Sequence, residues 1–151
     1  ELLTEEELRR MRYADLSDSM SQTFARDMFF FSIYCRGISF TDLAILGKVT
    51  LKASRSLTPH KFYPTHRHST IGHSHAAIAD RYPSTTDYLF PIIKSDDKIV
   101  ESREIGRVRE NITKALKLIA TRCNLSVVPS LKMTKDIYLR AIDNVSVSKI
   151  I

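Results

Sequence analysis

The sequence contains one arginine, Arg36, whose surroundings predict a fixed position. A cation held in this way could bind a phosphate or carboxylate group. Arg36 follows a dense apolar segment in which Phe24, Met28 and Phe31 recur at helical spacing. Gly37 is expected to end this helix as its C-cap, which would leave Arg36 at a rigid corner. A guanidinium presents five donors in a planar fork and suits such oxyanions. The alternative is an ordinary C-terminal arginine that faces the helix dipole.

Helices on both sides are expected to hold this corner in place. Ser39 and Asp42 form the Ser-x-x-acid arrangement that satisfies free backbone donors, so a new helix should begin soon after Gly37. The helix before the corner is apolar on most of its surface, which predicts that it is buried. Thr4 and Glu7 predict a capping box for a short helix near the N-terminus. The first third of the chain is therefore expected to be helical.

The rest of the chain predicts further helices and one small insertion of strands. Over residues 48–71 the apolar residues are spread among polar ones with Pro59 and Pro64, which favours short strands or an extended hairpin. The apolar segment 88–93 is expected to be extended, and Pro83 should stop a short helix before it. Helical periodicity predicts helices over 74–82, 105–123 and 132–142, and the start of another over 145–151.

Composition limits the class of protein. The 151 residues suit one mainly α domain, 1–151, with a small β insertion. Lys and Arg number 23 against 17 Asp and Glu, and the formal charge of +6 favours a polyanionic partner such as DNA, RNA or an anionic membrane face. Cys35 and Cys123 lack CxxC spacing, so no disulfide framework or zinc ribbon is expected. Without a membrane-length apolar run or a basic signal peptide, we expect a soluble, cytoplasmic protein.

Five histidines lie in one short segment and raise the question of a metal site: His60, His66, His68, His73 and His75. Two His-x-His pairs would place alternate side chains on one face of a strand, a spacing that zinc or nickel can use. However, Lys61 and Arg67 are interleaved and repel a cation, and no cysteine or carboxylate within the segment completes the set. We therefore predict a basic, solvated loop without a metal, which could contact a nucleic-acid backbone.

Three segments together resemble a known family: LTEEELRRM, FARDMFFFSIYCRGISFTDLAIL and IADRYPSTTDYLFPII, in this order. They are similar to the catalytic domain of tyrosine recombinases, the phage-integrase family, and especially to integrases of bacterial mobile elements. The resemblance covers most of the chain and is most specific in CRGISFTDLA. It implies that Arg36 binds the scissile phosphate and that Asp42 is the acidic residue that supports this arginine.

The resemblance also implies a reaction and its other participants. Family members attack a DNA phosphodiester with a tyrosine hydroxyl and need neither a metal nor a nucleotide cofactor. The family lysine would be Lys61 in HKFYPTHRH. The second cation would be Lys132 or Lys135 or, in another register, Arg140, in a stretch that lacks the usual Arg-His pair. The later Gly-His pair and the tyrosine nucleophile would fall beyond Ile151.

The sequence therefore predicts a DNA-binding protein of DNA integration and recombination whose 151 residues do not themselves cut and rejoin DNA. The expected contacts to double-stranded DNA come from basic side chains: Arg36, Lys61, Arg67, Lys132 and Lys135. A homo-oligomer on DNA is possible. The alternative is a non-catalytic relative that binds DNA or a recombinase partner, and a His-rich metal-binding or structural module is a distant third.

Overall fold

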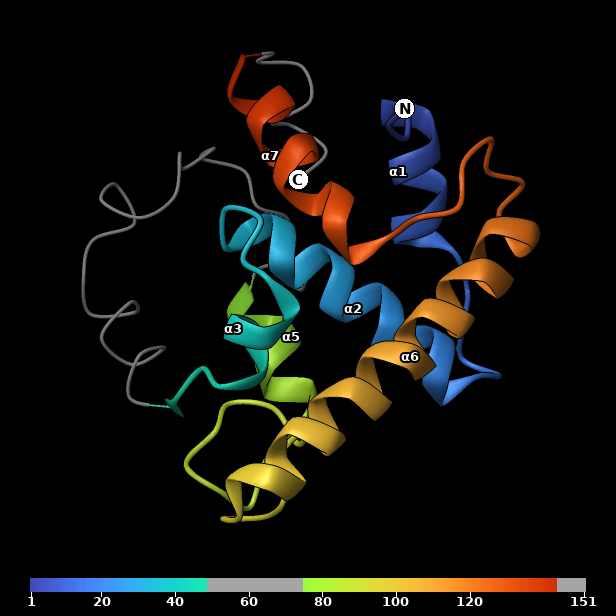
Figure 1. Ribbon diagram of the computed structural model, residues 1–151. Helices are drawn as coiled ribbons and strands as arrows, with labels where there is room; N and C mark the ends of the chain where they lie inside the picture. The colour runs from blue at the N-terminus through green and yellow to red at the C-terminus, as the bar shows by residue number, and fades with distance from the viewer. Residues whose placement is uncertain (49–74, 144–151) are drawn as a thin grey trace.

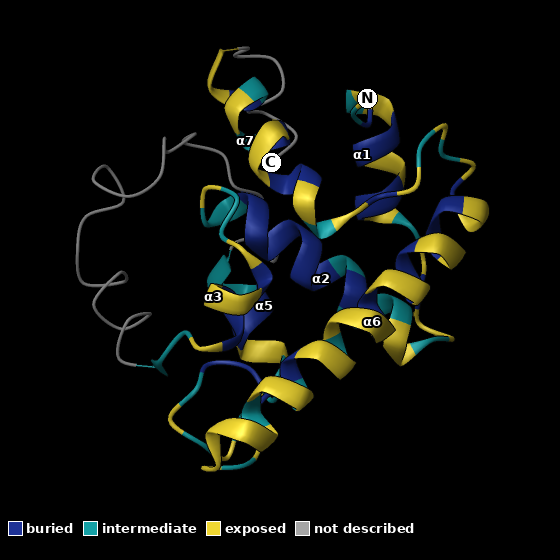
Figure 2. Ribbon diagram, viewed as in Figure 1, coloured by how far each residue is buried: buried dark blue, intermediate teal, exposed yellow. Residues whose placement is uncertain are grey.

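Helix α2 (Met20–Tyr34) crosses the middle of the molecule and contributes more buried residues than any other helix of the described ranges (Figures 1 and 2). Ser19 caps its start by accepting a hydrogen bond from the backbone N–H of Gln22. From Ala25 to Ile33 the helix is buried on nearly every side, and even Asp27 and Ser32 are covered. The prediction of a buried apolar helix is confirmed.

The computed structural model describes residues 1–48 and 75–143, and the described part is mainly helical, as the apolar periodicity predicts. Helix α2 packs against α6, α7 and α5, while α3 packs against α6. In chain order the other elements are α1 (Glu5–Tyr13), α3 (Phe40–Ala44), α5 (His75–Arg81), α6 (Lys98–Arg122), the 3-10 helix η2 (Leu131–Met133) and α7 (Thr134–Asp143).

Local sequence signals explain several of these elements. The capping box of Thr4 and Glu7 is present at the start of α1. Helix α5 ends two residues before Pro83, which restricts the backbone before it. In α6 the buried residues recur on one stripe and the opposite face is exposed (Figure 2). This amphipathic helix therefore packs its apolar face against α2 and the core.

The small β insertion predicted from the sequence has little counterpart in the described residues. The range 48–71 lies almost wholly outside the described residues. In the part of the chain that is described, β pairing is limited to one isolated bridge between Gly47 and Tyr88. The segment 88–93 is not extended as predicted but bends, with the N–H of Ile92 donating to the carbonyl of Phe90. Bending lets this segment bury its apolar side chains, and Phe90 meets Phe31 edge to face at 4.8 Å.

Candidate functional site

Arg36 occupies an unusual backbone conformation at the end of α2. Its N–H donates to the carbonyl of Ile33, and the N–H of Gly37 donates to the carbonyl of Ser32, at 3.1 and 2.7 Å. These two bonds form a Schellman motif, in which the residue after the C-cap adopts the left-handed conformation. That residue is Arg36, with φ of 64°, and the C-cap is Cys35. The prediction that Gly37 is the C-cap is therefore wrong by two positions.

The end of α6 also forms a Schellman motif, and there the left-handed residue is an asparagine, which favours this conformation. Asn124, with φ of 52°, follows the C-cap Cys123, and the N–H of Leu125 donates to the carbonyl of Ala120. Asparagine tolerates the left-handed region because its short polar side chain can bond locally. For a longer side chain such as arginine, the left-handed conformation costs about 1–2 kcal/mol. Within the described ranges these two are the non-glycine residues with positive φ. The side chain of Arg36 is exposed.

The following residue, Gly37, brings this corner against the start of α7. Gly37 also has a positive φ, 74°, and a Cβ added there would lie 2.6 Å from Cβ of Lys135 and 2.7 Å from its backbone N. Real Cβ atoms do not approach other atoms so closely, so glycine is required by the contact as well as by the φ angle. The structure thus places Lys135 directly beside the residue that follows Arg36.

A buried pair of hydroxyl groups fixes the same junction from inside. Ser32 Oγ lies 2.8 Å from Thr134 Oγ1, 2.7 Å from the carbonyl oxygen of Ile38, and Thr134 Oγ1 lies 2.8 Å from the carbonyl oxygen of Leu131. Each hydroxyl carries one proton, so two of these three contacts can be hydrogen bonds at any moment. Both side chains are almost fully buried. The chain of oxygens ties the end of α2 to the turn before α7.

The other residues predicted for the site fall into four groups. Lys135 is exposed in the first turn of α7, and its backbone lies against Gly37. Lys132 is exposed three residues earlier, in η2. Asp42 is exposed in α3, where its Oδ2 accepts a hydrogen bond from Ser39 Oγ at 2.9 Å; Ser39 also caps the helix as predicted. Arg140 Nη2 instead donates to the carbonyl of Leu3 at 2.6 Å, which links α7 to the N-terminal segment. Lys61 and Arg67 lie outside the described residues.

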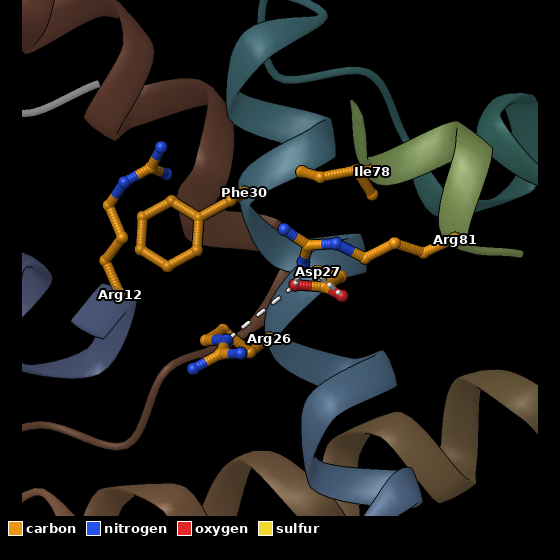
Figure 3. Close-up of a pocket in the computed structure, with 6 residues that line it drawn as sticks. All are labelled: Arg12, Arg26, Asp27, Phe30, Ile78 and Arg81. Atoms are coloured by element: carbon orange, nitrogen blue, oxygen red, sulfur yellow. Dashed lines mark hydrogen bonds and ion pairs between the residues drawn. The ribbon is translucent and has the colours of Figure 1, made fainter. Parts of the chain in front are cut away.

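The structure also contains basic residues in defined places that the sequence patterns did not single out. Arg109 of α6 donates from Nη2 to Thr41 Oγ1 at 2.6 Å and lies over the ring of Phe40 at 5.7 Å, so it holds α3 on α6. Arg109 falls between the apolar positions of the helix predicted over 105–123, and no motif distinguishes it from the other polar residues there. A second group, Arg12, Arg26 and Arg81, lines a pocket (Figure 3). The adjacent Arg26 and Asp27 inside an otherwise apolar helix were the one visible signal for that pocket.

The predicted absence of a metal site is not tested by the structure. Four of the five clustered histidines, and therefore most of that segment, lie outside the described ranges. Among residues 1–48 and 75–143, no group of three or more His, Cys, Asp or Glu side chains is arranged to hold an ion. None of the helices in these ranges combines the length and apolar character needed to cross a membrane.

Comparison with known proteins adds no relative to this description. No protein-family model, no curated protein and no solved structure matches the chain.

Proposed function

We propose that this chain binds the phosphate backbone of duplex DNA through the corner at Arg36, in the service of site-specific DNA integration or recombination. The observation that carries the proposal is an exposed arginine held in a backbone conformation that normally selects glycine or asparagine. Strained residues of this kind persist where the surrounding fold over-determines them and cluster at functional sites. The formal charge of +6 favours the same class of partner.

The neighbouring cations suit this role. Arg36 has the planar fork that binds a phosphate in bidentate geometry. Lys135, whose backbone lies against Gly37, and Lys132, three residues before it, are exposed and carry compact point charges on the adjoining segment. The corner is rigid because the Schellman bonds and the Ser32–Thr134 pair fix it on two sides. A rigid cation loses less conformational entropy on binding than a lysine on a loose chain. The resemblance to tyrosine recombinases assigns Arg36 the same ligand, a DNA phosphate.

One observation favours the alternative of a relative that binds without chemistry. Arg140, the residue that would supply a second guanidinium in one register, donates to the carbonyl of Leu3. The cations beside the Arg36 corner are then lysines, which lack the bidentate geometry of arginine. We therefore propose phosphate recognition by these 151 residues and no strand cleavage.

The test is a titration of a labelled DNA duplex by fluorescence anisotropy at several salt concentrations. We expect weak binding with little sequence preference, and a log–log salt slope of about −0.9 for each phosphate contacted. The double variant Lys132→Ala with Lys135→Ala should bind more weakly and with a shallower slope. Its control is Lys114→Ala with Lys117→Ala, which removes the same charge from the exposed face of α6. No binding at low salt, or equal losses in the two double variants, would contradict the proposal.

A further inference from the structure

Arg109 is exposed near the middle of α6, and two residues of α3 hold its side chain in place. Its Nη2 donates to Thr41 Oγ1 at 2.6 Å, and its guanidinium carbon lies over the ring of Phe40 at 5.7 Å. Among residues 1–48 and 75–143, no carboxylate forms an ion pair with Arg109. This arginine therefore combines a defined position with a positive charge that is not neutralised by an acidic partner in these ranges.

Both contacts leave the charge of Arg109 available to a ligand. An aromatic face stabilises a guanidinium but does not neutralise it. A guanidinium carries five N–H donors in a planar fork, and the Thr41 hydroxyl accepts one of them. Within the part of the chain that the structure describes, this is the one hydrogen bond that the Arg109 guanidinium makes. Because the side chain is exposed, its remaining donors can bind an anion from solution.

Two acidic residues are neighbours of this group in the sequence, and each has another partner. Asp42, next to Thr41, accepts a hydrogen bond from Ser39 Oγ at 2.9 Å. Glu110, next to Arg109, pairs with Lys114 at 3.4 Å. Neither carboxylate would have to leave Arg109 before a phosphate could bind it.

The residues that hold Arg109 belong to the segment that also carries Arg36. Phe40 and Thr41 begin α3, which follows the Arg36 corner and packs on α6 (Figure 1). Five peptide units join Arg36 to Thr41, so their Cα atoms are at most about 18 Å apart. Duplex DNA carries one negative charge per about 1.7 Å of its axis, so a stretch of this length carries about ten. A duplex bound at the Arg36 corner therefore has phosphates at a spacing that suits a second cation here.

We propose that Arg109 makes a second contact to the phosphate backbone of the DNA that Arg36 binds. The Thr41 hydroxyl and the Phe40 ring orient its guanidinium before DNA arrives, which reduces the entropy lost on binding. Phe40 is 6 % exposed, so the surface under Arg109 is part of the packed fold. The inference rests on the proposed function, because it extends the same binding surface from the corner to α3 and α6.

The experiment is an anisotropy titration of a labelled DNA duplex with the full chain at several salt concentrations, for the wild type, Arg109→Gln and Arg107→Gln. The control residue Arg107 is exposed on the same helix, and two residues turn a helix by about 200°, so it projects from nearly the opposite side. We expect Arg109→Gln to bind about tenfold more weakly, with a log–log salt slope reduced by about 0.9. Arg107→Gln should match the wild type in both quantities.

The salt slope separates a phosphate contact from a purely structural role. If Arg109 only holds α3 on α6, Arg109→Gln lowers the melting temperature and leaves the slope at the wild-type value, which overturns the proposal. Equal slopes in the two arginine variants overturn it as well. If Arg109→Gln does not fold, ¹H–¹⁵N NMR spectra of the wild type decide. DNA must then shift the Nε–H resonance of Arg109 more than that of Arg107, and equal shifts refute the contact.

The variant Arg36→Gly distinguishes failure of this inference from failure of the proposed function. If Arg36→Gly loses affinity and Arg109→Gln does not, the Arg36 corner stands and the Arg109 contact is refuted. If only Arg109→Gln loses affinity and salt slope, the Arg109 contact stands and the role of the corner is refuted. A wild-type chain that binds no DNA at low salt overturns both.

Discussion

Gly37 at the end of α2 lies so close to the backbone of Lys135 at the start of α7 that no side chain fits between them. This contact joins two segments that are far apart in the chain, and it places the exposed Lys135 beside the residue that follows Arg36. Glycine is required at this position by its own positive φ and by the contact with Lys135. The contribution of this contact to the free energy of unfolding can be measured directly.

Replacing Gly37 by Ala should be severely destabilising, by about 3 kcal/mol or more, because the new Cβ would overlap Lys135 and the positive φ would be strained as well. The matched control is Gly106→Ala. Gly106 lies in α6 with open space where its Cβ would go, so alanine should stabilise the chain by about 1 kcal/mol through helix propensity. Thermal or urea denaturation measures both variants. A Gly37→Ala variant as stable as the wild type would contradict the close contact.

The hydroxyl pair of Ser32 and Thr134 should act as one energetic unit. Changing either residue to Ala leaves the other buried hydroxyl without this partner, so each single variant should lose about 1–2 kcal/mol. The double variant should lose less than the sum, with a coupling energy of about 0.5–1.5 kcal/mol. Urea denaturation of the four proteins gives this coupling energy. Strict additivity would show that the pair does not connect α2 to α7.

The Glu7 carboxyl should make the free energy of unfolding depend on pH in the acid range. Hydrogen bonds from Ser126 and from the backbone of Thr4 lower the pKa of Glu7 from 4.5 to about 2. Because the pKa is depressed in the folded protein, its stabilising effect is complete above pH 4.5 and is lost as pH falls towards 2. Glu7→Gln should cost on the order of 1 kcal/mol at neutral pH. Denaturation of both proteins from pH 7 to pH 2 should show this difference shrink, and a constant difference would contradict it.

The sequence was most informative where local rules decide the structure. The capping box of Thr4 and Glu7, the stop before Pro83 and the stripe of α6 each depend on residues a few positions apart, and all three are confirmed. The identity of the left-handed residue was not predictable in this way. Gly37 has a positive φ as well, and the approach of Lys135, a distant residue, adds a requirement for glycine that no local rule contains. The local rule that a glycine after a helix marks the capping position therefore did not locate the C-cap of α2.

The site was predictable only in part, for a related reason. The position of Arg36 at a helix end is predictable because a glycine and a helix start follow it directly, and the structure confirms that position. The pocket of Arg12, Arg26 and Arg81 depends on three helices that meet around Asp27, and no sequence spacing indicates that meeting. Likewise, the sequence offers Arg140 as the second catalytic cation in one register, and no local pattern indicates its bond to the Leu3 carbonyl, which connects α7 to the N-terminal segment.

The central claim is that Arg36 is kept in a strained position for its charge, and the variant Arg36→Gly separates charge from strain. Glycine adopts the left-handed conformation without the steric cost, so the variant should be as stable as the wild type or more stable by up to about 1 kcal/mol. Asn124→Gly is the control, since it replaces the left-handed residue of α6 without removing a charge.

The decisive measurement is the DNA affinity and melting temperature of Arg36→Gly beside the wild type and Asn124→Gly. We predict that Arg36→Gly melts no lower than the wild type, binds duplex DNA more weakly by about 1–3 kcal/mol, and has a salt slope reduced by about 1. Asn124→Gly should bind DNA as the wild type does. A less stable Arg36→Gly whose DNA affinity is unchanged would contradict the account, because Arg36 would then serve the fold and not a phosphate.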